Sequence, residues 1–302
     1  MNILIIGGSG FVSSHVMDAA LAAGHTVWYV TRGLREPVQG AHPIIADRND
    51  PHALAAALKS VGITFDAVLD CICFNDKQAM DTLAVLQDFT NRVVAISTDS
   101  CYDSAYKNVP QDEHGSQYFE DDSYGAQKRR MELAFLNHCP HSIKWTLFRP
   151  PHMYGPRAEL GCYPTHTRQK DLLEHLRRGK PITLTGDGSY LLQALDARDL
   201  ANAMVSCIDN PKTCNEIFCI AGPDVITNKQ YFEILGDILG LPVTFESTSE
   251  AEHLSAHPDS IIYFCDRVYD LGKLKNAGLP MPSIGIRQGL KEQAEWLIAQ
   301  GR

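Results

Sequence analysis

The stretch ILIIGGSGFVS, residues 3–13, decides the fold of this chain. Four apolar residues end at Gly7, and apolar side chains then recur at helical spacing from Val12 to Ala23. A strand, a glycine loop and a helix therefore follow one another. Glycine lets the backbone approach a pyrophosphate, and a helix N-terminus offers free N–H groups and partial positive charge. The order predicts a dinucleotide-binding loop, with contacts from Gly7, Ser9, Gly10, Phe11 and Val12; a purely structural turn is the alternative.

The loop departs from the usual pattern at Ser13, where a third glycine normally permits close packing of helix and strand. The second predicted strand, 26–30, should select the form of the dinucleotide. An acidic residue after it would bond the ribose hydroxyls of NAD, but Thr31 and Arg32 stand there. Because arginine can pair with a 2′-phosphate or stack on adenine, the sequence favours NADP over NAD. An exposed arginine without a role is the alternative.

Further contacts with the dinucleotide are predicted after the third and fourth strands. Asp47 could accept a hydrogen bond from the adenine amino group, with Arg48 beside it, although Asp47 could equally cap its loop. Cys71 and Cys73 are two residues apart, which on a strand places both side chains on one face. We expect Cys71 to contact the cofactor.

The alternation of strands and helices continues along the chain. Near-continuous apolar strands are typical of a parallel sheet covered on both faces, so we predict an α/β, Rossmann-type doubly wound fold. Residues 1–156, rejoined by about 189–222, are predicted to form the dinucleotide-binding domain, and 157–188 with 223–302 mainly a small discontinuous substrate-binding cap. The expected strands are 67–73, 92–96, 143–148 and 216–220; the expected helices are 51–59, 77–89, 124–137, 171–178, 199–208, 227–239, with Thr227 as N-cap, and 284–299.

Composition narrows the class of protein. The 302 residues are 44% apolar and 21% charged, ordinary values for a globular chain, and the formal charge of −9 argues against a nucleic-acid binder. The short basic clusters 128–130 and 177–178 are better explained as solvated helix faces than as RNA contacts. No apolar run suits a membrane span or a signal peptide, so we expect a cytoplasmic protein with nine reduced cysteines. Neither the histidines nor the cysteines suggest a metal site.

Tyr124 and Lys128 are candidate catalytic residues. They start a predicted helix and, four residues apart, share one face of it. A lysine ammonium near a phenol lowers the phenol's pKa, which suits Tyr124 to proton transfer, and the same lysine can reach a cofactor ribose. The preceding strand, 92–96, ends in hydroxyl residues, and ligands bind at the carboxyl ends of such strands.

Together these motifs resemble the extended short-chain dehydrogenase/reductase superfamily, the NAD(P)-dependent epimerase/dehydratase group. The resemblance covers nearly the whole chain and implies that Thr98 joins Tyr124 and Lys128 in catalysis, that Pro150 lies beside the nicotinamide, and that the chain forms a homodimer through helices near 76–90 and 124–138. It rests on the glycine loop, the Tyr–Lys pair and the segments FRPPHMYGP (148–156), GDGS (186–189), DARDLA (196–201) and FCIAG (218–222).

Departures from the family's patterns bear on the substrate. Ser97-Thr98-Asp99 is similar to the start of the nucleotide-sugar 4,6-dehydratase motif, but Ser100 replaces the glutamate that works in elimination. This argues against a dehydratase and leaves Asp99 as a possible acid. Leu192 stands where nucleotide-sugar epimerases usually carry a diphosphate-binding arginine. A nucleotide diphosphate substrate would then need another arginine, for which the candidates are Arg157, Arg168 and Arg267.

Three functions follow as hypotheses. The first is an NAD(P)-dependent epimerase or oxidoreductase acting on a hydroxyl carbon of a sugar or sugar nucleotide. The second is a carbonyl reductase that exchanges NADPH at each turnover. The third is a non-catalytic RNA-binding protein, because 193–199, 31–33 and 47–50 are also similar to the branch of the chloroplast stem-loop RNA-binding proteins.

Overall fold

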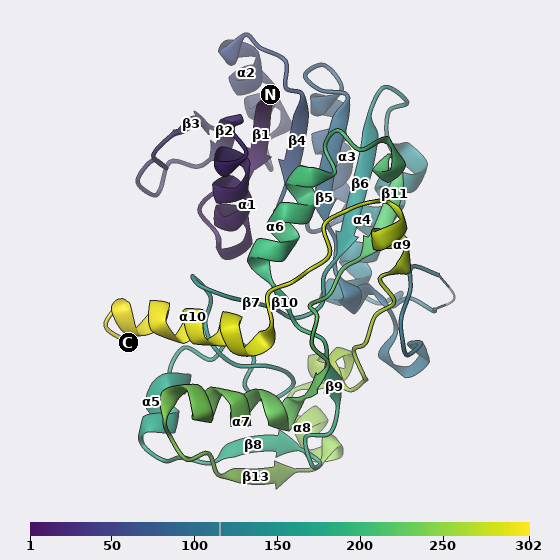
Figure 1. The fold of residues 1–302 in the computed structure, drawn as a ribbon. Coiled ribbons are helices and arrows are strands. Elements are labelled where there is room, and N and C mark those ends of the chain that lie inside the picture. Colours follow the sequence, from purple (N-terminus) through teal and green to yellow (C-terminus); the bar gives the residue numbers. More distant parts are fainter. Residues whose placement is uncertain (115) are drawn as a thin grey trace.

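The computed structural model describes residues 1–114 and 116–302. Its main sheet has seven parallel strands in the order β11-β6-β5-β4-β1-β2-β3 (Figure 1). The order reverses between β1 and β4, which makes the sheet doubly wound and opens a crevice at the carboxyl ends of these two strands. The predicted α/β Rossmann-type fold is confirmed. The strands are β1 (Asn2–Ile6), β2 (Thr26–Thr31), β3 (Ala41–Ile45), β4 (Ala67–Asp70), β5 (Arg92–Ile96), β6 (Lys144–Arg149) and β11 (Glu216–Cys219).

Helices cover both faces of this sheet. Because successive side chains of a strand point to opposite faces, Ile3 and Ile5 of β1 pack under α1 (Phe11–Ala22) and α6 (Ala197–Ser206). Leu4 and Ile6 pack on the other side, under α2 (Pro51–Val61), α3 (Asp76–Leu86) and α4 (Tyr124–His138). The continuous apolar run in 3–6 is thus the signature of a strand buried on both faces.

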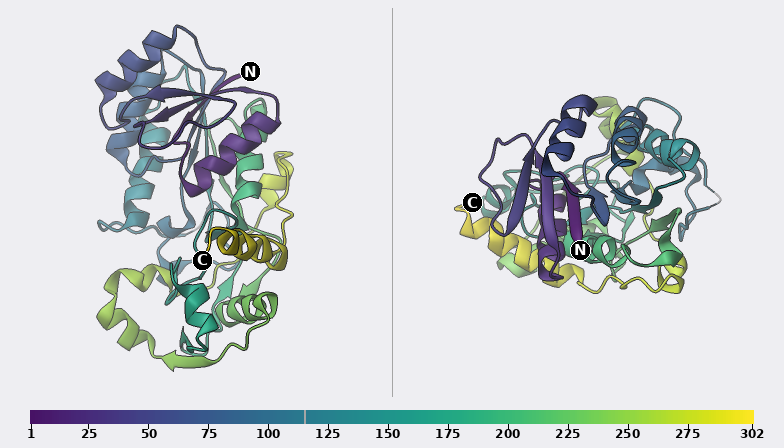
Figure 2. Two further views of the ribbon diagram at one scale, coloured as in Figure 1. Left: turned by 90° about the vertical axis from the view of Figure 1, so that its left-hand side faces the viewer. Right: turned by 90° about the horizontal axis from the view of Figure 1, so that it is seen from above.

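A second lobe lies beyond the carboxyl edge of the sheet (Figure 2). Its apolar core includes Leu173, Ile182, Phe232 and Leu290. Two short strand pairs connect it to the sheet lobe: β7 (Met153–Tyr154) with β10 (Leu195–Asp196), and β9 (Leu191–Leu192) with β12 (Ile226–Thr227). The remaining elements of the lobe are α5 (Leu172–Arg177), β8 (Ile182–Thr185), α7 (Asn228–Leu239), β13 (Phe245–Thr248), α8 (Glu250–Ala256) and α10 (Ile286–Ala299).

Not all of residues 223–302 pack in this second lobe. Leu274, in α9 (Gly272–Asn276), and Leu279 belong to the apolar cluster beneath α1 and α6. The short 3-10 turns are η1 (Asp99–Cys101), η2 (Ser104–Tyr106), η3 (Pro211–Thr213) and η4 (Pro258–Tyr263). The division into a dinucleotide-binding domain and a cap stays a prediction.

The helices and strands begin and end close to the residues predicted from the sequence, except at a few places. The strand predicted over 67–73 ends at Asp70, because the carboxylate of Asp70 accepts a hydrogen bond from the Ile72 amide at 3.0 Å and turns the chain. The prediction that Cys71 and Cys73 lie on a strand is therefore wrong. Thr227 is the N-cap of α7 as predicted, accepting from the Gln230 amide at 3.1 Å.

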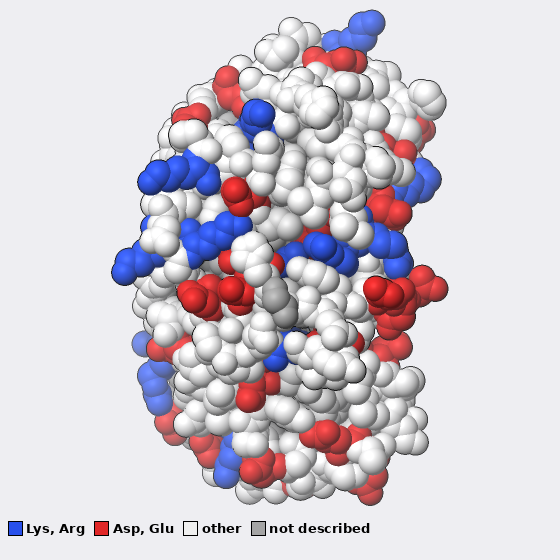
Figure 3. Space-filling view, turned by 90° about the vertical axis from the view of Figure 1, so that its right-hand side faces the viewer, with Lys and Arg blue, Asp and Glu red and all other residues white. Residues whose placement is uncertain are grey.

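Three further features concern the helices, the charges on the surface and the cysteines. In the described part of the chain, no helix is long and apolar enough to cross a membrane. On the face that Figure 3 presents, basic side chains are interspersed with acidic ones. All nine cysteines are free thiols, and six of them are buried.

Candidate active site

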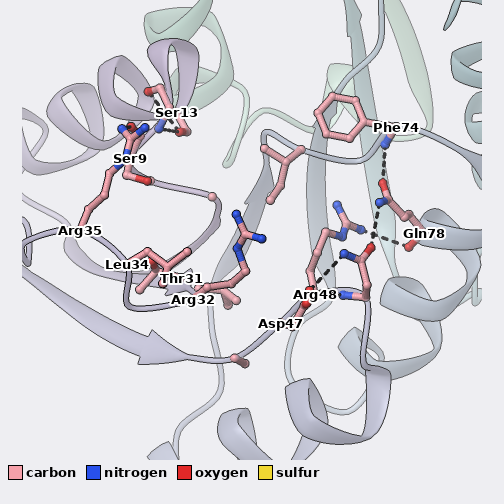
Figure 4. A pocket seen from close by; sticks show the side chains of 17 residues that line it. Ser9, Ser13, Thr31, Arg32, Leu34, Arg35, Asp47, Arg48, Phe74 and Gln78 are labelled. Carbon is pink, nitrogen blue, oxygen red and sulfur yellow. Dashed lines mark hydrogen bonds between the residues drawn. The ribbon is translucent and has the colours of Figure 1, made fainter.

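The glycine loop borders a cavity of about 510 Å³ at the carboxyl ends of β1 and β2 (Figure 4). Gly7 and Gly8 have φ of 108° and 148°, which L side chains rarely adopt, and a Cβ at Gly8 would lie 2.8 Å from the ring of Tyr29. A Cβ at Gly10 would meet only the Ser13 hydroxyl, at 3.4 Å. The backbone at Gly10 is therefore bare on its outer side, as close approach by a phosphate requires.

Ser13 has a role of its own at the start of α1. Its hydroxyl accepts a hydrogen bond from the Gly10 amide at 3.1 Å, which closes the loop. The amides of Phe11 and Val12 occupy the first two helical positions, where no partner exists within the helix. The first turn carries no acidic side chain, so the positive end of the helix dipole is not offset there. The loop thus fits a bound pyrophosphate.

The predicted selector residue Arg32 lines this cavity (Figure 4) and is exposed. Arg35 lies nearby and donates a hydrogen bond to the carbonyl of Ser9. Sequence reasoning missed Arg35, because a contact with Ser9 across 26 residues leaves no local pattern. Two cations therefore stand beyond β2, where a carboxylate would suit NAD. Thr31 also lines the cavity, and its hydroxyl accepts from the Gly33 amide at 3.2 Å.

Asp47 and Arg48, in the loop after β3, also line this cavity. Asp47 accepts from the Asn49 amide at 2.9 Å, so it caps its loop while still facing the cavity. Arg48 is buried: its guanidinium pairs with Asp70 at 3.1 Å and donates to the Thr82 hydroxyl at 2.6 Å. Arg48 therefore ties β4 to α3.

A second cavity of about 340 Å³ adjoins the first, sharing Gly10, Ser13, Ile72 and Phe74 with it. It lies between the carboxyl ends of β4 and β5 and the second lobe, and no Asp or Glu is among the described residues that line it. The structure brings together eight of the predicted site residues here: Gly10, Phe11, Val12, Cys71, Thr98, Tyr124, Lys128 and Pro150.

Tyr124 stands at the mouth of this second cavity, half-exposed. Removal of water from its hydroxyl raises the pKa of Tyr124, while the charge of Arg168 and an interaction with the Thr98 side chain act in the opposite direction. Gly125 makes this placement possible. A Cβ there would lie 1.9 Å from the Ser100 carbonyl oxygen, so only glycine lets α4 pack this closely on η1.

Lys128 is buried one turn further along α4. Its ammonium donates to the carbonyls of Cys73 at 2.6 Å and Ile96 at 2.5 Å. Burial lowers the pKa of Lys128 to about 8. The ammonium therefore sits between the ends of β4 and β5, and its predicted influence on the pKa of Tyr124 stays a prediction.

Asp99 does not line either cavity. Its buried carboxylate pairs with Arg267 and with Lys107 at 3.0 Å, and it accepts from the Tyr269 hydroxyl at 2.5 Å. Asp99, which the sequence left as a possible acid, is therefore bonded to three side chains in the protein interior. Arg267 in turn lies 5.0 Å from the ring centre of Tyr163, which forms part of the cavity wall.

Glu132 is a further buried residue that sequence reasoning missed. Its carboxylate takes a bidentate pair from Arg149, at 2.7 Å for each bond, and accepts from the Ser97 hydroxyl at 2.6 Å. Since Ser97 lines the second cavity, Glu132 fixes α4 against the end of β5. The spacing of the sequence could have indicated Glu132, because it lies one helical turn beyond Lys128 and two turns beyond Tyr124.

The candidates for a substrate-binding arginine differ in what they contact. Leu192, which stands in place of the usual arginine, is fully buried. Arg157 pairs with Asp18 at 2.7 Å on the surface, and Arg267 pairs with Asp99. Arg168 lines the second cavity, with its guanidinium 5.6 Å from the ring centre of Phe11.

Two histidines of the second lobe have the spacing of helical metal ligands. His253 and His257 lie four residues apart, a pairing that the sequence reasoning overlooked, with ring centres 5.1 Å apart. Within residues 1–114 and 116–302, no group of three or more His, Cys, Asp or Glu side chains is arranged to hold a metal ion.

The fold, the bare glycine loop and the adjoining cavity define an enzyme of the dinucleotide-binding α/β class. A family model described as the NAD dependent epimerase/dehydratase family matches residues 3–221, and the chain belongs to this family. The resemblance drawn from the sequence motifs is thereby confirmed.

The chain is also similar to individual proteins. The chain is 26% identical to a UDP-N-acetyl-alpha-D-glucosaminuronate decarboxylase of Bacillus cytotoxicus, over 97% of this chain and 96% of that protein. It is 25% identical to the chloroplast stem-loop binding protein of 41 kDa b of Arabidopsis thaliana, over 74% of this chain and 60% of that protein. In fold it is similar to a UDP-glucuronic acid 4-epimerase of Bacillus cereus, solved with UDP-glucuronic acid and NAD, with a TM-score of 0.78, 18% identity and coverage of 99% and 100%.

Proposed function

We propose that this chain is an NADP-dependent oxidoreductase or epimerase that acts on a hydroxyl carbon of a sugar or sugar nucleotide. The observation that carries the proposal is the second cavity, where Thr98, Tyr124 and Lys128 adjoin the glycine loop. A substrate hydroxyl beside Tyr124 would lie next to the place where a nicotinamide would emerge from the first cavity.

The preference for NADP is supported by charge. Arg32 and Arg35 stand after β2, and Asp47, the one carboxylate in the cavity's described lining, faces them from the loop after β3. A 2′-phosphate carries close to two negative charges, which guanidinium groups bind with charge-assisted hydrogen bonds. The amides of Phe11 and Val12 would hold the pyrophosphate.

Three side chains of the cavity would each have a separate role in the reaction. Tyr124 takes the proton of the substrate hydroxyl during oxidation and returns it during reduction. Thr98 orients that hydroxyl, and Lys128 holds the cofactor ribose by exchanging one of its carbonyl partners. The bound nicotinamide supplies the chemistry of hydride acceptance and return.

The experiment compares wild type with Tyr124→Phe. Turnover of carbonyl sugars with NADPH should fall by at least about 100-fold, the usual range for loss of a general acid or base. NADPH affinity, measured by fluorescence titration, should stay unchanged, because Tyr124 lies outside the first cavity. Unchanged turnover in the variant would refute the role of Tyr124.

A reductase that exchanges its cofactor at each turnover is the second candidate. Exposed arginines that bind the 2′-phosphate are accessible to NADPH that binds and is released in every cycle. An epimerase would instead retain its dinucleotide between turnovers. Purified protein that carries dinucleotide favours the epimerase, and protein that is empty but binds NADPH favours the reductase.

A homodimer through α3 and α4 is a separate part of the proposal. Met80 on α3 and Leu136 on α4 are 45% and 46% exposed, and the pairing of these helices between two chains would bury both apolar side chains. Sedimentation analysis should give twice the mass of the chain, and Leu136→Lys should shift the species toward monomer.

A further inference from the structure

Arg168 combines three features that ordinary surface arginines lack. It lines the second cavity, on the side of the second lobe. Its backbone is left-handed, with φ of 48°, a conformation that costs energy in a non-glycine residue and often marks a functional position. In the described part of the chain, its guanidinium has no hydrogen bond and no acidic partner; its neighbour is the ring of Phe11.

The loop that carries Arg168 is fixed rather than loosely attached. Gly161, with φ of 111°, packs so closely that a Cβ there would lie 1.8 Å from the carbonyl oxygen of His166. His166 accepts a hydrogen bond from the Thr183 amide of β8 at 3.0 Å, and Thr165 donates to the Thr183 carbonyl at 2.5 Å. The structure therefore holds the strained residue in place beside the cavity.

The charged side chains in the described lining of the second cavity are all basic. Arg168 and Lys128 line it without any acidic side chain among its described residues, and Lys128 is already occupied by two carbonyls. The other cations of the region are paired, Arg157 with Asp18 and Arg267 with Asp99. Among the described residues that line the cavity, one guanidinium is thus left to receive an anion, and a single compact oxyanion suits a single guanidinium.

We propose that Arg168 binds an anionic group of the substrate, and that this substrate is a hydroxy or keto compound with a single compact oxyanion, a carboxylate or a phosphate monoester, close to its reacting carbon. The inference rests on the proposed function and narrows its substrate class. Closeness to the reacting carbon follows because Arg168 and Tyr124 line the same small cavity. Burial raises the pKa of Tyr124, and the charge of Arg168 offsets part of this rise.

The test titrates NADP⁺-saturated protein at constant ionic strength, by calorimetry, with D-glucuronate, D-glucose 6-phosphate, D-glucose and UDP-glucose as probes. A charged monosaccharide should bind at least about tenfold more tightly than glucose, since a hydrogen bond to a charged group contributes this much. Glucuronate and glucose 6-phosphate distinguish a carboxylate from a phosphate. UDP-glucose should bind no more tightly than the better of these two.

Arg168→Met should abolish the advantage of the charged sugar, Arg168→Lys should keep part of it, and the matched control Arg157→Met should leave it unchanged. NADPH affinity should be the same in all of them. Equal binding of charged and neutral sugars, absence of binding by every probe, tightest binding of UDP-glucose, or a loss of NADPH affinity in Arg168→Met would overturn the inference. Failure of wild type to bind any dinucleotide would instead refute the proposed function.

Discussion

Replacing Glu132 by glutamine should lower the free energy of unfolding far more than the loss of one charge from an exposed ion pair would. Glu132 and Arg149 are 0% and 1% exposed, and the variant leaves the guanidinium of Arg149 buried without a counter-charge. Breaking a buried ion pair by removing one partner costs about 3–5 kcal/mol. The amide oxygen of glutamine can still accept a hydrogen bond, so we expect the lower end, about 3 kcal/mol. Urea unfolding at pH 7 and fixed protein concentration measures the difference.

The control is Glu174→Gln, because the pair of Glu174 with Arg178 has the same 2.7 Å separation but is 51% and 64% exposed. Such a pair contributes about 0.3–0.5 kcal/mol. The pH dependence gives a second check. Burial would raise the pKa of Glu132, but Arg149 and the hydrogen bonds outweigh it and hold the pKa below its usual value. The contribution is therefore complete above about pH 4.3, the ordinary value for glutamate, and is lost as pH falls through the lower pKa of the folded state.

Two results would refute this reasoning. Equal destabilisation by the two substitutions would mean that burial does not decide the strength of these pairs. A difference between wild type and Glu132→Gln that stays constant as the pH falls through the acid range would mean that the ionised carboxylate is not the stabilising species.

Three further predictions follow from the site. Arg32→Met should weaken NADPH binding by at least about tenfold and leave NADH binding nearly unchanged, since only NADPH carries the 2′-phosphate; fluorescence titration checks both. Gly125→Ala should push α4 away from the Ser100 carbonyl, because the added Cβ would lie 1.9 Å from that oxygen, and turnover should fall by about 100-fold. The control is Gly236→Ala, whose added Cβ would lie 2.4 Å from Val243; this variant should lose stability but not turnover. Because burial lowers the pKa of Lys128 to about 8, the unfolded chain binds more protons above that pH; the free energy of unfolding should rise from pH 8 to 10 more steeply in wild type than in Lys128→Met.

The sequence predicted the parts of the site that short spacings encode. The glycine loop directly follows an apolar strand, and Tyr124 and Lys128 are neighbours on one helix, so local periodicity sufficed to place them. The same holds for the strand at 92–96, which the structure reproduces at both ends.

Long-range contacts could not be predicted from one sequence. The carbonyl partners of Lys128 come from Cys73 and Ile96, which the fold alone brings together. The pairing of β8 with β13 was missed because Phe245–Thr248 has one apolar residue and no alternation. The similarity of Ser97-Thr98-Asp99 to the dehydratase motif made Asp99 a possible acid, but it gave no indication that Asp99 pairs with Arg267, 168 residues away in the sequence.

The most direct test of the account is the identity and affinity of the bound dinucleotide. Purified protein is denatured, any released nucleotide is identified, and stripped protein is titrated with NADPH and NADH. We predict one dinucleotide site per chain, with NADPH bound at least about tenfold more tightly than NADH. Absence of binding by either dinucleotide would contradict the account, and equal affinities would contradict the roles of Arg32 and Arg35.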